Sequence, residues 1–159
     1  MTTEEGQKIV ILEWSEHPVE GEGRERKGFS DESRRDTLRG RLVSGLGEGQ
    51  HYVARDGYRK QFQEKLGFDP FPGTLNIRLD RPFDYAWRRA IKIEGFLDEG
   101  VTFGKCSCYK VKVMGIEAAI VRPERSSYPQ DLVEVIAPIR LRSSLGLADG
   151  DEVMLRLEE

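Results

Sequence analysis

The sequence predicts a mainly β protein that is built as a closed barrel with two short helices. Short runs with strand character recur along the chain between glycine, proline and aspartate residues, and several of them alternate apolar with polar side chains. Only two segments have the periodicity and the end signals of a helix. A doubly wound sheet needs a helix between successive strands, so many strands with few helices favour a barrel.

Eight runs are expected to form strands. Alternation is clearest over residues 74–79, 109–113 and 153–157, where one face of each run is apolar. These three runs are therefore predicted to be half-buried strands. The eight expected strands are 38–44, 50–54, 74–79, 91–96, 106–113, 116–121, 132–136 and 153–157.

Two helices are expected between these strands. In the first, Tyr58, Phe62 and Leu66 follow one another at four-residue spacing, and Gly67 is a typical C-terminal stop. The second covers residues 139–145, where it follows a proline and ends at a glycine. Both are short, as a barrel with a few connecting helices requires.

Length and charge divide the chain into an extension and a domain. The 159 residues are enough for one core, and no run approaches the roughly 18 apolar residues of a membrane span. Residues 1–36 hold ten acidic and six basic side chains with few apolar ones, so we expect a flexible extension over 1–36 and a barrel domain over 37–159. The net charge of −3 and the acidic N-terminus predict a cytoplasmic protein with neither a nucleic-acid nor a membrane partner.

Two cysteines, Cys106 and Cys108, are the only thiols in the chain. Two positions apart on one strand, they point to the same face and are too poorly oriented to form a disulfide. The chain has only two histidines, and neither lies near the cysteines in sequence. A zinc site lacks ligands there, so both thiols are predicted to be structural.

A glycine-rich segment joins the first two expected strands. Three glycines at alternate positions let backbone N–H groups approach a phosphate closely, so this loop is a candidate anion site. The loop has neither the lysine of a P-loop nor a long helix after it, and a glycine-rich hairpin turn explains it equally well. Its residues are Gly45, Leu46, Gly47, Glu48, Gly49 and Gln50.

A second candidate site lies at the start of the expected strand 74–79. Thr74 and Asn76 follow a Pro72–Gly73 turn and project from one strand face, about 6.6 Å apart along it. Two neutral oxygens at this spacing suit Mg²⁺, which commonly takes one or two protein ligands and completes its shell with water and phosphate. The alternative is a polar outer face with no ligand.

These motifs, taken in order, resemble the archaeal CTP-dependent riboflavin kinases over roughly residues 38–157. The resemblance implies a six-stranded cradle-loop barrel, related to the ATP-dependent flavokinases, that transfers the γ-phosphate of CTP to riboflavin and gives FMN and CDP. The motifs that carry it are Gly45–Gly49, Tyr58 with Phe62, Leu66–Pro70, Pro72–Asn76, Glu134–Pro138 and Leu141–Arg142.

The resemblance also implies roles for single residues. The glycine loop 45–50 and the segment Ile139, Arg140, Leu141 and Arg142 would hold the nucleotide. Thr74 and Asn76 would bind Mg²⁺, and Ser126 and Glu134 would contact the flavin. Where relatives are expected to have threonine, this chain has Ser126.

The chemistry of the residues agrees with phosphoryl transfer, which needs positioning and charge neutralisation more than covalent help. Glu134 precedes four apolar residues and is a candidate general base, the alternative being an exposed strand residue. Arg140 or Arg142 could supply a cation, or both could be solvated helix charges. Two other functions stay open: a non-catalytic ligand-binding or transcription-related barrel, and a small-molecule kinase that uses ATP.

Overall fold

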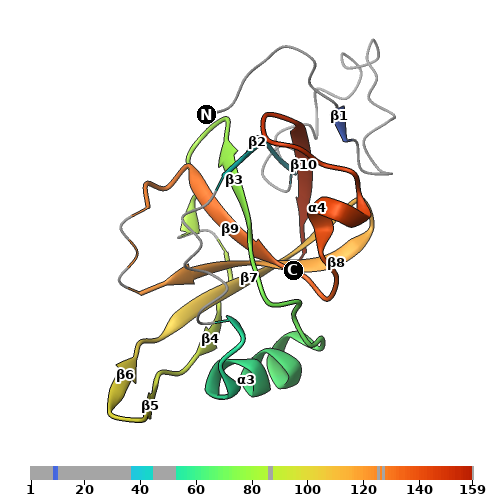
Figure 1. Cartoon of the computed structure of the whole chain (residues 1–159). Helices are drawn as coiled ribbons and strands as arrows, with labels where there is room; N and C mark the ends of the chain where they lie inside the picture. Colours follow the sequence, from blue (N-terminus) through green and yellow to red (C-terminus); the bar gives the residue numbers. More distant parts are fainter. Residues whose placement is uncertain are drawn as a thin grey trace.

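In the computed structural model of the chain, residues 9–10, 37–44, 53–85, 88–124, 126 and 128–158 are described. Six antiparallel strands form a ring in the order β10-β2-β3-β9-β8-β7, and β7 pairs back with β10 (Figure 1). The closing pairs join Arg156 to Lys112 and Leu157 to Val111. This confirms the predicted closed six-stranded barrel. Its strands are β2 (Thr37–Val43), β3 (Leu75–Leu79), β7 (Cys106–Val113), β8 (Ile116–Pro123), β9 (Leu132–Ile136) and β10 (Glu152–Leu157).

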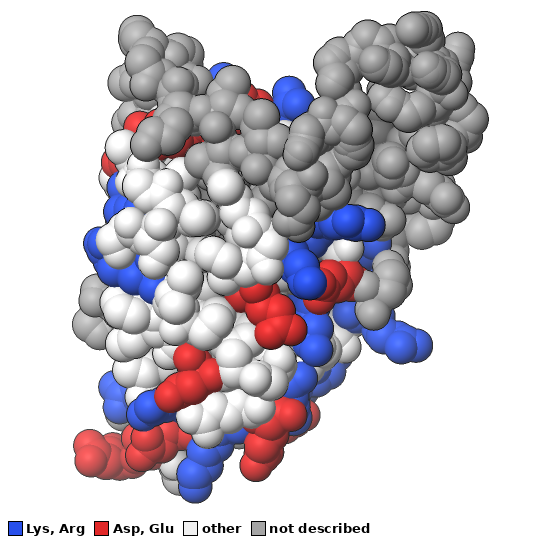
Figure 2. All heavy atoms as spheres, turned by 90° about the vertical axis from the view of Figure 1, so that its right-hand side faces the viewer, with Lys and Arg blue, Asp and Glu red and all other residues white. Residues whose placement is uncertain are grey.

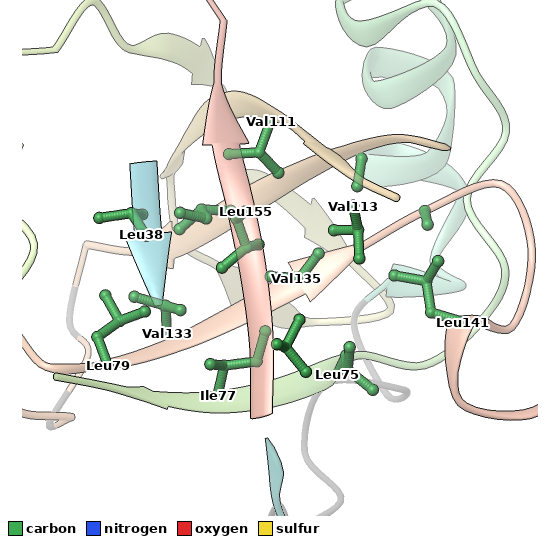
Figure 3. Packing of buried hydrophobic residues seen from close by; sticks show 14 of the residues in the cluster. Leu38, Leu75, Ile77, Leu79, Val111, Val113, Val133, Val135, Leu141 and Leu155 are labelled. Carbon is green, nitrogen blue, oxygen red and sulfur yellow. The ribbon is translucent and has the colours of Figure 1, made fainter. Parts of the chain in front are cut away.

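The barrel interior is filled by alternate side chains of all six strands. Ile77, Val111 and Leu155 are each fully buried, and Figure 3 shows such side chains converging from several strands. Burial of each such side chain contributes about 1.5–3 kcal/mol, which makes this cluster the main source of stability. The period of two that places these residues inside sends their neighbours to the outer face.

Helix α3 (Asp56–Leu66) packs on the outside of the barrel. Its buried face, Tyr58, Phe62 and Leu66, lies against outward side chains of β7, β8 and β9 such as Cys108. As predicted, the helix ends at Gly67, whose φ of 88° is left-handed. Helix α4 (Leu141–Ser144) is shorter than the expected 139–145.

Two expected strands differ from the structure. Of the expected strand 50–54, residues 50–52 lie outside the described residues. Val53 begins a helical turn, and its side chain is buried with those of Tyr58, Phe62 and Leu66, which accounts for its apolar character. The run 91–96 is split into β4 (Ile91–Ile93) and β5 (Phe96–Asp98), and β5 forms a hairpin with β6 (Val101–Phe103). The break falls at Gly95, where a Cβ atom would lie 2.3 Å from the carbonyl oxygen of Phe103.

Strand β1 (Ile9–Val10) pairs in parallel with Glu152 and Val153 of β10. The division of the chain at residue 36 stays a prediction. Cys106 and Cys108 are both buried and unbridged, as expected. Within the described residues, no helix has the length and apolar character needed to cross a membrane.

Candidate functional site

Asn76, the only asparagine in the chain, lies on the outer face of β3 between two residues that fill the barrel interior. Its side chain is nevertheless buried, with 7% of the residue exposed. Its Oδ1 atom has no hydrogen-bond partner among the described residues. Leaving a buried acceptor unsatisfied costs about 1–3 kcal/mol, so this oxygen is a marked exception in a folded protein.

Glu134 lies directly opposite Asn76 on the neighbouring strand β9. The strand register continues this row to Val43 on one side and Val121 on the other. Glu134 is 5% exposed, and the Tyr128 hydroxyl donates a hydrogen bond to its Oε2 atom over 3.4 Å. A carboxylate and an unsatisfied amide oxygen therefore share one buried row on the outside of the barrel. The alternative of an exposed strand residue at Glu134 is therefore wrong.

Thr74 is half-buried and immediately precedes β3. The turn before it is attached to another part of the chain, since the Phe71 N–H donates to the carbonyl of Ala137 over 2.8 Å. Ala137 precedes the segment that was predicted to hold a nucleotide. The predicted metal ligand Thr74 and the start of the predicted nucleotide segment thus lie at the same end of the barrel.

Asp149 connects α4 to the end of β2. Arg142 on α4 donates to Asp149 Oδ1 over 2.8 Å, and the hydroxyl of Ser44, the residue after β2, donates to Oδ2. These bonds, that from Ser44 first, lower the pKa of Asp149 below its usual value, so the carboxylate is charged at neutral pH. The predicted glycine loop, Gly45, Leu46, Gly47, Glu48, Gly49 and Gln50, lies outside the described residues.

The residues of the predicted nucleotide segment 139–142 differ from one another in their exposure to solvent. Ile139 and Arg140 are exposed, and Arg142 is held by Asp149. Leu141 is 4% exposed and packs into the barrel core, so only its backbone is available to a ligand. Of the two candidate cations, Arg140 is the more accessible.

Ser126 and Glu134, the two predicted flavin contacts, are linked through Tyr128. The Tyr128 backbone N–H donates to Ser126 Oγ over 3.1 Å, and its hydroxyl reaches Glu134. Sequence reasoning missed both Tyr128 and Asp149. Tyr128 lies in an aperiodic loop, and Asp149 lies in the turn between α4 and β10, so neither offered a periodic signal.

The donor set fits a hard cation with few protein ligands. The oxygens of Thr74 and Asn76 are neutral, and the described residues contain no cluster of three His, Cys, Asp or Glu side chains that could hold a metal by themselves. Such a site suits Mg²⁺ bound together with phosphate oxygens. On the face shown in Figure 2, basic and acidic side chains are intermixed rather than gathered into one charged patch.

The closed antiparallel ring with one outer helix defines the class of protein, which is a riboflavin-kinase-like barrel. Comparisons with known proteins agree. The family profile CTP-dep_RFKase, described as "Domain of unknown function DUF120", matches residues 42–157. The chain belongs to this family, the CTP-dependent riboflavin kinases, which are transferases.

Curated relatives named riboflavin kinase cover almost the whole chain. The protein from Methanocella arvoryzae is 52% identical over 158 residues, which is 99% of this chain and 74% of the relative. Those from Methanococcoides burtonii and Archaeoglobus fulgidus are 48% and 46% identical, over 98% and 95% of this chain and 72% and 67% of their own lengths.

Proposed function

We propose that this protein transfers the γ-phosphate of CTP to riboflavin in a Mg²⁺-dependent reaction that yields FMN and CDP. Family membership supports riboflavin phosphorylation, and the family's name supports CTP as the donor. The observation in the molecule that carries the proposal is the buried Oδ1 of Asn76, which has no partner among the described residues and lies opposite the buried Glu134. An unsatisfied oxygen beside a carboxylate is costly to fold unless a ligand uses it.

Thr74 and Asn76 are the residues that would hold Mg²⁺. When bound, the ion neutralises phosphate charge as it develops during transfer. The chain's contribution is to orient the two oxygens beforehand. Thr74 follows a turn that includes Pro72 and is tied to Ala137, and Asn76 sits within a paired strand, so little conformational entropy remains to be lost on binding.

Glu134 is proposed to accept the proton of the riboflavin hydroxyl that becomes phosphorylated. The hydroxyl oxygen forms a bond to the γ-phosphorus, the bond from that phosphorus to the β,γ-bridging oxygen breaks, and CDP leaves with the bond's electron pair. Burial favours this role, because an acceptor shielded from water stays aligned with its substrate.

The two substrates would approach Glu134 from different directions. The nucleotide is proposed to contact the glycine loop 45–50 and residues 139–142; Ser44, the residue before that loop, and Arg142 both bond to Asp149. The flavin is proposed to contact Ser126 and Glu134, which the loop before β9 joins through Tyr128. This arrangement favours transfer between two bound substrates over a barrel that binds one ligand without chemistry.

The test is to incubate the purified protein with riboflavin, Mg²⁺ and each of the four nucleoside triphosphates, and to separate FMN from riboflavin by chromatography. We expect FMN with CTP, far less with ATP, and none when EDTA removes the metal. Equal rates with ATP and CTP over a range of concentrations would refute CTP specificity. No FMN with any nucleotide would refute the kinase activity.

A further inference from the structure

We propose that Tyr128 is a positioning residue that joins Ser126 and Glu134 into one riboflavin-binding surface, an inference that rests on the proposed function. Two of its polar groups bond to these two residues. Its backbone N–H donates to Ser126 Oγ over 3.1 Å, and its phenol hydroxyl donates to Glu134 Oε2 over 3.4 Å.

The loop that carries Tyr128 is anchored to strand β8 by Arg122. One guanidinium nitrogen, Nη2, donates to the Tyr128 carbonyl over 3.0 Å, and the other, Nη1, lies 3.5 Å from the Pro129 carbonyl. The guanidinium also stacks over the Tyr85 ring, 4.9 Å from its centroid. A flat fork that bonds two carbonyls while it stacks on a ring is a geometry that lysine lacks.

These contacts favour one orientation of the carboxylate. Arg122 holds the backbone of Tyr128, and the Tyr128 hydroxyl bonds to Oε2 of Glu134, so the phenol contributes to orienting that carboxylate. The same residue fixes the Ser126 hydroxyl from the other side. Removing the phenol oxygen should weaken riboflavin binding by releasing the Glu134 carboxylate, while α4, attached elsewhere through the bond from Arg142 to Asp149, stays in place.

The test compares Tyr128→Phe with the wild type in steady-state kinetics and in direct binding, measured by the quenching of riboflavin fluorescence. We expect the riboflavin KM and Kd to rise about 5- to 10-fold, the effect of one lost hydrogen bond, with the CTP KM changed less than about twofold. Unchanged riboflavin constants, or equal rises for both substrates, would overturn the proposal.

The matched control is Tyr58→Phe. It deletes a phenol oxygen that donates to the Gly104 carbonyl over 2.5 Å, a bond that involves none of Ser126, Tyr128 and Glu134, so it should lower the melting temperature without changing the riboflavin constants. If Tyr128→Phe itself melts early, Arg122→Lys replaces it and must show the same rise for riboflavin alone. A wild type that makes no FMN would refute the proposed function, whereas an active wild type with an unaffected variant would refute only the role of Tyr128.

Discussion

Replacing Asn76 by leucine tests the metal site through both stability and activity. The buried Oδ1 of Asn76 has no hydrogen-bond partner among the described residues, and an unsatisfied buried acceptor costs about 1–3 kcal/mol. Leucine has the same number of side-chain heavy atoms with the same branching, carries no polar atom and lacks the low strand preference of asparagine. At roughly 2–4 °C per kcal/mol for a chain of this size, the metal-free melting temperature should rise by about 2–12 °C.

The same substitution removes the proposed Mg²⁺ ligand. We expect Asn76→Leu to form no FMN, and its melting temperature to respond no further to Mg²⁺ and CTP, whereas the wild type should be stabilised by them. The assay is differential scanning fluorimetry with EDTA, with Mg²⁺ and with Mg²⁺ plus CTP, run alongside FMN formation against Mg²⁺ concentration.

Arg78→Leu is the matched control, because Arg78 lies two residues further along the same strand face and pairs with Asp131 at the surface over 3.0 Å. It should retain the wild-type metal dependence and lose at most about 1 kcal/mol of stability. Wild-type activity and metal dependence in Asn76→Leu would refute the assignment, and a metal-free melting temperature below that of the wild type would refute the reasoning about its unsatisfied oxygen.

Four further predictions follow from the same geometry. Glu134→Gln should keep the fold and lower kcat by roughly 10²- to 10⁴-fold; a rise in the riboflavin KM alone would make Glu134 a flavin contact and not the base. Asp149→Asn should raise the CTP KM more than the riboflavin KM, because it weakens the bond from Arg142; an unchanged CTP KM would contradict this. Burial raises the pKa of Tyr58 from 10.0 to about 12, so the stability that depends on its neutral form is complete below pH 10 and is lost as the pH rises toward 12. Between these pH values the melting temperature of Tyr58→Phe should therefore fall less than that of the wild type. Equal falls in both proteins would show that another group is responsible. Deleting residues 1–36 should leave FMN formation largely intact, since the part of this segment that is described, β1, adds only two paired residues to β10. A loss of activity together with a fall of more than several degrees in melting temperature would show that the segment belongs to the fold.

The sequence by itself determined the barrel and the chemical character of the site. Alternating runs such as 75–79 and 153–157 predict which side chains fill the interior, because a strand's period of two is a local property. The four-residue spacing of Tyr58, Phe62 and Leu66 likewise predicts the buried face of α3. Asn76 and Glu134 could be singled out from motifs and from a family resemblance.

Only the tertiary structure decided how those residues meet. Strand register places Asn76 opposite Glu134, and register depends on pairing between strands more than 50 residues apart in sequence. Three features join positions that share no local sequence pattern. They are the burial of Asn76 and Glu134 on the outer face, the attachment of α4 through Asp149, and the link from Arg122 through Tyr128 to Glu134. Periodicity reports which face of an element is apolar, whereas the partners of a polar side chain are set by the packing of distant segments against each other.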